Sequence, residues 1–203
     1  MNPQVLDKIP LKPSEEQRIS LSGVRWQQYQ LLRGVLYDTP GIRTAYLDGE
    51  VEIMTLSERH EYIKSQISRL LEVYLYEINV DFHRQGSFTM GGENEGASGE
   101  PDESYSLGER KAIPDLVIEV IITSGTFNRR EMFRRLGVAE VWFWKNSLLF
   151  IYDLNAENDQ PIAASNLLPN LDINLFLTYV NSQDQNAAAR NFRQAIRQQQ
   201  NQQ

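Results

Sequence analysis

Hydrophobic residues recur along this chain at two spacings, and the clearest strand pattern lies at residues 113–122. This apolar run is rich in β-branched residues and has the length of a strand buried on both faces, with Pro114 near its beginning. Alternation along a strand predicts that Leu116, Ile118, Val120 and Ile122 face one side and Asp115, Val117, Glu119 and Ile121 the other. Glu119 is the exception to the apolar pattern. A buried carboxylate needs a cation, a metal or a proton beside it, although a Glu at a strand end paired with a structural Arg is the alternative.

Further strands and helices are predicted on both sides of this run. Residues 44–47 and 51–55 flank Asp48-Gly49, a strong hairpin signal, and residues 138–144 and 148–154 predict a second hairpin. Residues 101–106 predict a strand antiparallel to 113–122, residues 80–90 another strand, and the Gly-rich stretch 91–99 a mobile loop. Helices are predicted from Ser22 to about 38, from Ser57 to about 78, over 128–136 and over 173–180. This order of elements predicts an α/β fold with a central sheet flanked by helices.

The length of 203 residues is typical of one domain with additions at its ends. Residues 1–21 are polar and contain three prolines, which predicts an N-terminal arm rather than a core element. Residues 22–182 form the predicted domain. Residues 183–203 form a Gln-rich tail, either a low-complexity extension or a marginal helix, which we expect to be dispensable for the core.

Composition narrows the choice of environment and partner. No apolar run reaches membrane-spanning length, the chain has no cysteine and its first residues lack the apolar core of a signal peptide, so we expect a cytoplasmic protein without a membrane partner. The formal charge of −7 argues against a non-specific polyanion binder, but it allows a local basic surface. With only His60 and His83, a multi-histidine metal site is excluded, and for His60 capping or packing competes with a functional role.

Short motifs spaced along the chain connect these elements to a chemistry. Pro101-Asp102, followed on the next strand by Glu119-Val120-Ile121, resembles the PD-(D/E)XK nuclease superfamily. A wider set of motifs resembles the putative restriction endonuclease family common in cyanobacteria, and the resemblance runs from about 26 to 177. These motifs are 46–50 (Tyr-Leu-Asp-Gly-Glu), 59–61 (Arg-His-Glu), 100–103 (Glu-Pro-Asp-Glu), 114–120 (Pro-Asp-Leu-Val-Ile-Glu-Val) and 136–142 (Leu-Gly-Val-Ala-Glu-Val-Trp).

That resemblance implies a restriction-endonuclease-like core with a central mixed sheet and a DNA endonuclease that uses Mg²⁺ or Mn²⁺. It assigns Asp102 and Glu119 as catalytic metal ligands, because carboxylates on adjacent strands can hold a hard divalent cation. It also suggests Glu61, in the preceding helix, as a third metal ligand. The alternative for Glu61 is an ordinary first-turn acid favoured by the helix dipole.

The sequence lacks the lysine that the PD-(D/E)XK superfamily usually carries after its Glu. The usual position, two residues after Glu119, holds Ile121, and the lysine that substitutes for it in relatives corresponds here to Arg129. Arg129 shares the helical stripe of Met132, Phe133 and Leu136 and should therefore point inward. Arginine can brace a phosphate, but it does not readily transfer a proton.

Several interpretations stay open beside this one. The chain could be a weakened nuclease-like protein that binds nucleic acid or a protein partner, or a hydrolase that uses its carboxylate pair on sugars. Arg130, Arg134 and Arg135 could meet phosphates or form a solvated charged face. Glu50 and Glu52 are interpreted as solvated strand residues. Cleavage of both DNA strands would suit a homodimer.

Overall fold

A computed structural model describes residues 16–201 of the chain. The N-terminal elements are β1 (Arg18–Leu21), α1 (Trp26–Leu36), β2 (Ile42–Leu47), β3 (Glu50–Thr55), α2 (Glu58–Glu77), β4 (Phe82–Arg84), β5 (Met90–Gly92) and β6 (Ala97–Gly99). The C-terminal elements are β7 (Glu103–Leu107), β8 (Leu116–Ile121), α3 (Arg129–Arg135), β9 (Glu140–Lys145), β10 (Leu148–Asp153), α4 (Ile173–Val180) and α5 (Gln185–Gln200). Within residues 16–201, no helix is both long and apolar enough to cross a membrane.

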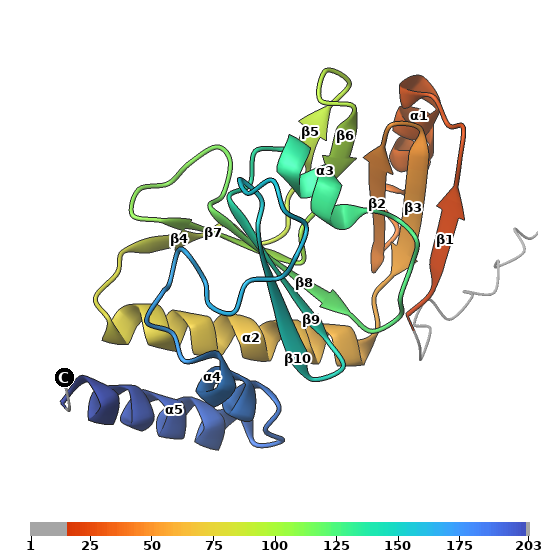
Figure 1. The fold of residues 1–203 in the computed structure, drawn as a ribbon. Helices are drawn as coiled ribbons and strands as arrows, with labels where there is room; N and C mark the ends of the chain where they lie inside the picture. Colours follow the sequence, from red (N-terminus) through yellow and green to blue (C-terminus); the bar gives the residue numbers. More distant parts are fainter. Residues whose placement is uncertain (1–15, 202–203) are drawn as a thin grey trace, which may run out of the picture.

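The strands form two five-stranded sheets. The first has the order β1-β3-β2-β6-β5, and the second has the order β10-β9-β8-β7-β4. The second sheet is mixed, because β8 and β9 are parallel while its other neighbours are antiparallel. Helix α2 lies along one side of this sheet, α4 packs beside it against β9 and β10 with α5 beyond, and α3 lies on the opposite side near the first sheet (Figure 1). The α/β class with a mixed sheet flanked by helices is thus confirmed.

Strand β8 is buried on both faces, which explains its continuous apolar sequence. On one face Leu116, Ile118 and Val120 pack in the cluster that includes residues of α2, α4 and α5. On the other face Val117 packs with Met132 and Phe133 of α3. The alternation predicted for residues 113–122 is confirmed over the strand itself, and it directs Glu119 toward the α3 side of the sheet.

The C-terminal part of the chain is more ordered than its composition indicates. Residues Gln185–Gln200 form α5, whose Ala188, Phe192 and Ile196 are buried at four-residue spacing. Arg197 binds Glu77 of α2, with its Nε 2.6 Å from Glu77 Oε2. This helix belongs to the same hydrophobic cluster as α2. Of the two interpretations of the tail, the helix is therefore observed, because the Gln-rich composition includes a narrow apolar stripe. Its packing argues against a dispensable tail, but dispensability itself stays a prediction.

Two further expectations differ from the structure. The single strand expected over residues 80–90 is instead β4 and β5, which belong to different sheets. The loop expected over residues 91–99 contains the β5–β6 hairpin. Its Gly91 has φ +83°, and a Cβ there would overlap the carbonyl oxygen of Ala97, so only glycine suits this close approach. The predicted hairpins β2–β3 and β9–β10 are confirmed.

Candidate active site

Asp102 and Glu119 lie side by side on neighbouring strands. In the antiparallel β7–β8 pair Glu103 is opposite Ile118, which places the preceding Asp102 next to Glu119. The Asp102 amide donates to Glu119 Oε1 at 3.2 Å, and the Val120 amide donates to Asp102 Oδ2 at 2.7 Å. Both side chains are buried. The structure brings the two acids together as the strand pattern predicted, while their role as metal ligands stays a prediction.

Arg129, the first residue of α3, points into the same region. Asn128 caps the helix by accepting a hydrogen bond from the Glu131 amide. The Arg129 guanidinium donates from Nη1 to Glu119 Oε2 at 2.9 Å and from Nη2 to Glu52 Oε1 at 2.7 Å. Although burial opposes its charge, Glu119 and Glu52 raise the pKa of Arg129, so it stays protonated. The inward direction predicted from the helical stripe is observed.

Glu52 was assigned wrongly as a solvated residue. It lies in the middle of β3 with only 1% of its surface exposed, and it also accepts from Arg18 Nη1 at 3.1 Å. Glu50, at the start of the same strand, is exposed and binds Ser22, as expected. The alternation of side chains along β3 indicates the burial of Glu52, because Glu52 lies two residues before the buried Met54 and shares its side of the strand.

Helix α2 contributes His60 rather than Glu61. The His60 ring is fully buried, with Nδ1 2.9 Å from Glu16 Oε2 and Nε2 3.0 Å from Asp102 Oδ1, at ion-pair distance. Glu61 is half exposed and pairs with Lys64 at 2.6 Å. The assignment of Glu61 to the acidic cluster is therefore corrected. Consecutive helical residues point about 100° apart, and His60 shares the inward stripe of Ile63 and Ile67.

The segment before β1 also reaches this region. Glu16 accepts hydrogen bonds from His60 and from the Thr123 amide, the latter at 3.0 Å, and its other close partner is Arg18 Nε at 2.9 Å. At least residues 16–21 of the predicted arm are therefore integral to the fold, since β1 also pairs with β3. The first fifteen residues of that arm lie outside the described residues.

These contacts join seven side chains in one buried ion cluster. Its members are Glu16, Arg18, Glu52, His60, Asp102, Glu119 and Arg129. Burial disfavours a charged imidazole, but Asp102 and Glu16 outweigh it and raise the pKa of His60 to about 9. Burial likewise works against the charge of Asp102, yet His60 and the Val120 amide hold its pKa below the usual range. At neutral pH the cluster therefore contains a charged His60.

The charges of the cluster do not balance. Four carboxyl groups face two guanidinium groups and one imidazolium, which leaves one acid in excess. Burial raises the pKa of Glu119 to about 8, with a further contribution from Asp102, even though Arg129 opposes this rise. The surplus negative charge favours uptake of a proton by the cluster, and an added cation would equally offset that charge.

The donor chemistry fits a hard divalent cation, because Asp102 and Glu119 offer carboxylate oxygens close together. In the present arrangement, however, each of their four oxygens has a close protein partner: His60, the Val120 amide, the Asp102 amide and Arg129. Within residues 16–201 no group of three His, Asp or Glu side chains is arranged to hold a metal ion. Arg129 thus occupies the Glu119 oxygen that a cation would need.

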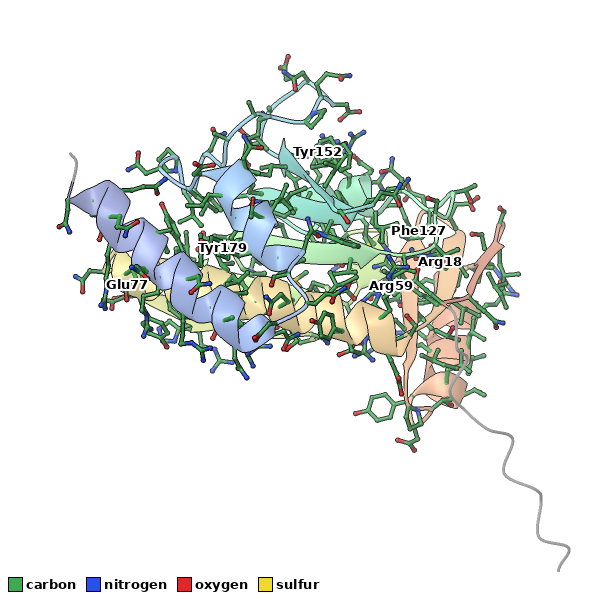
Figure 2. The ribbon with its side chains drawn as sticks, turned by 90° about the horizontal axis from the view of Figure 1, so that it is seen from below. Arg18, Arg59, Glu77, Phe127, Tyr152 and Tyr179 are labelled. Atoms are coloured by element: carbon green, nitrogen blue, oxygen red, sulfur yellow. The ribbon has the colours of Figure 1, made fainter. Side chains whose placement is uncertain are left out.

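A cavity of about 350 Å³ adjoins the cluster. Arg18 and Arg129 line it together with α3 and the ends of β8 to β10, and none of its lining residues is acidic. Figure 2 shows Arg18 and Phe127, two of the lining residues, close together near the end of β8. Arg130 also lines this cavity, whereas Arg134 and Arg135 bind Asp159 and Asp48 at the surface.

Comparison with known families covers most of the chain. The family described as putative restriction endonuclease (Uma2) matches residues 26–180. A search of curated proteins found no match. The matched region contains Glu52, Asp102, Glu119 and Arg129, but it leaves out Glu16, Arg18 and all of α5.

Proposed function

Since the chain belongs to the putative restriction endonuclease family, we propose that it is a divalent-cation-dependent endonuclease that hydrolyses DNA phosphodiester bonds. The observation that carries this proposal is the buried Asp102–Glu119 pair on adjacent strands, beside a cavity lined in part by arginine and lysine side chains. Burying two neighbouring carboxylates costs free energy of folding, and such pairs are typical of sites that act on a charged ligand.

In this proposal Asp102 and Glu119 hold Mg²⁺ or Mn²⁺. The ion, when bound, would polarise the scissile phosphate and lower the pKa of an attacking water. Arg129 keeps its charge at neutral pH and would contact a phosphate oxygen after its guanidinium leaves a carboxylate. His60 holds Asp102 in its ionised form. We also propose that the protein is cytoplasmic and that it acts as a homodimer, in which each subunit cuts one DNA strand.

Cleavage of supercoiled plasmid DNA in the presence of Mn²⁺ tests this activity. Asp102→Asn and Glu119→Gln should each reduce the rate by about a hundredfold or more, the scale of a lost electrostatic contact in a transition state. Asp115→Asn is the matched control, because Asp115 binds Lys111 and the Leu107 amide away from the cluster. Equal cleavage by all three variants would refute the assignment, and activity that persists in a chelator would favour metal-free hydrolysis.

A nuclease-like protein that binds DNA without cutting it is the second candidate. It is favoured by Ile121 at the superfamily's lysine position and by Arg129, whose guanidinium already engages Glu119 and Glu52. In an active enzyme Arg129→Lys should retain or raise Mn²⁺-dependent cleavage, whereas Arg129→Met should lower it about a hundredfold. DNA binding by the parent protein with no cleavage across a Mn²⁺ titration would support the second candidate.

A further inference from the structure

The cavity beside the buried ion cluster combines aromatic and cationic side chains in one place. Four aromatic residues line it: Phe127, Phe143, Phe150 and Tyr152. Lys145 reaches it from β9, where it is paired with Ile121 of the parallel strand β8. Paired residues of parallel strands face the same side, so Lys145 and Ile121 both lie on the Glu119 side of the sheet.

Two donors at this cavity have no partner within residues 16–201. The Lys145 side chain makes no ion pair or hydrogen bond with these residues, whereas Arg130, which also lines the cavity, pairs with Asp159. Arg18 Nη2 is buried and has no hydrogen-bond acceptor among the same residues, although the rest of its guanidinium binds Glu16 and Glu52. A buried donor without an acceptor is costly, so an anion that Nη2 reached by a shift of the Arg18 side chain would stabilise it.

The size and chemistry of the cavity favour one unpaired nucleotide. Its volume of about 350 Å³ is at the small end of ligand sites, which span roughly 300–1,000 Å³. Aromatic side chains stack on any base, and Tyr152 already has the Arg130 guanidinium 4.9 Å from its ring centre. A base that is stacked and paired in a duplex cannot enter such a pocket unless it first leaves the helix.

We infer that this cavity binds an unpaired nucleotide of single-stranded DNA, with Lys145 and Arg18 at the phosphate and the aromatic residues against the base. The inference rests on the proposed function, because it takes DNA as the ligand and places the bound strand beside Asp102 and Glu119. It adds a substrate class: single-stranded or frayed DNA is bound in preference to a closed duplex.

Fluorescence anisotropy with a labelled twelve-nucleotide oligo(dT) in chelator measures this binding without any cleavage. Lys145→Met should weaken the affinity about fivefold or more at low salt. It should also reduce the slope of log affinity against log salt concentration by about 0.7, the value for one lost phosphate contact on a single strand. Lys111→Met makes the same charge change outside the cavity and should alter neither quantity. Lys145→Arg should restore both.

Tyr152→Leu tests the aromatic part of the inference. It should weaken binding at least fivefold with an unchanged salt slope, because stacking involves no counterion release. The exposed Tyr37 supplies the control Tyr37→Leu. The inference is overturned if Lys145→Met behaves as Lys111→Met does, or if a hairpin duplex of equal length binds as tightly as the single strand. Loss of plasmid cleavage in Asp102→Asn with intact oligo(dT) binding separates this result from the proposed activity.

Discussion

Replacement of Arg129 by Met gives the sharpest prediction for the buried ion cluster. Methionine has a similar apolar length, but it removes a guanidinium that is 5% exposed and that binds both Glu119 and Glu52. Two buried carboxylates would lose their shared partner. Breaking a buried ion pair by removing one member costs about 3–5 kcal/mol. We expect Arg129→Met to lower the free energy of unfolding by that amount at pH 8, where more of Glu119 is ionised.

Arg134→Met, on the same helix, is the matched control. Arg134 is about 29% exposed, and it pairs with Glu131 and Asp159 at the surface. Surface pairs contribute at most about 1 kcal/mol, because water screens the charges and the side chains lose entropy. Urea denaturation followed by tryptophan fluorescence measures both variants, and equal slopes against urea concentration would show that the unfolding transition itself is unchanged.

A second substitution tests the cause of the loss. Glu119→Gln removes the surplus acid, so adding it to Arg129→Met should recover part of the lost stability. Glu52→Gln in the same background should do likewise, since Glu52 receives two hydrogen bonds from Arg129. A loss below about 1 kcal/mol in Arg129→Met, or no recovery in either double variant, would refute a charge-balanced cluster and indicate that Arg129 contributes packing alone.

Two other predictions concern pH and α5. The pKa of Glu119 is raised from 4.5 to about 8 and that of His60 from 6.5 to about 9, so their stabilisation is complete below pH 4.5 and 6.5 respectively. Both contributions are lost as pH rises through the folded pKa values, so thermal midpoints should fall between about pH 5 and 9, and Glu119→Gln should flatten that fall below pH 8. Phe192→Ala in α5 should cost about 3–5 kcal/mol in urea denaturation, because Phe192 is buried against α4, whereas the exposed Gln199 should tolerate alanine within about 0.5 kcal/mol.

Local periodicity was sufficient for the parts of the fold and site that depend on neighbouring residues. The alternation of β8 placed Glu119 on the α3 side, and the stripe of α3 placed Arg129 inward. The antiparallel pairing of two adjacent segments then brought Asp102 to Glu119. Each of these inferences spans fewer than thirty residues of chain, within which strand and helix geometry fix the direction of a side chain.

Contacts between distant segments were beyond such reasoning. Glu16 binds the Thr123 amide across 107 residues, and Glu52 binds Arg129 across 77. Alternation could place Glu52 on the side of Met54, but nothing in the local pattern says which sheet faces α3, so it could not name Arg129 as the partner of Glu52. The prediction of Glu61 rather than His60 as the contribution of α2 had a different cause. It rested on the residue type of Glu61 and not on which helical face each residue occupies. The same preference for composition over phase made α5 look like an extension.

The choice of arginine at position 129 and the burial of Glu52 have a common physical explanation. A lysine ammonium is a compact charge that can neutralise one carboxylate closely, whereas the guanidinium is a planar fork that binds two acceptors at once. Arg129 uses that fork to join Glu119 in the second sheet to Glu52 in the first. Glu52 is in turn neutralised by Arg18, and Glu16 bridges Arg18 to His60. Asp102 and Glu119 are therefore held by a chain of ion pairs that begins before the matched family region, so residues 16–18 belong to the buried ion cluster as much as Asp102 does.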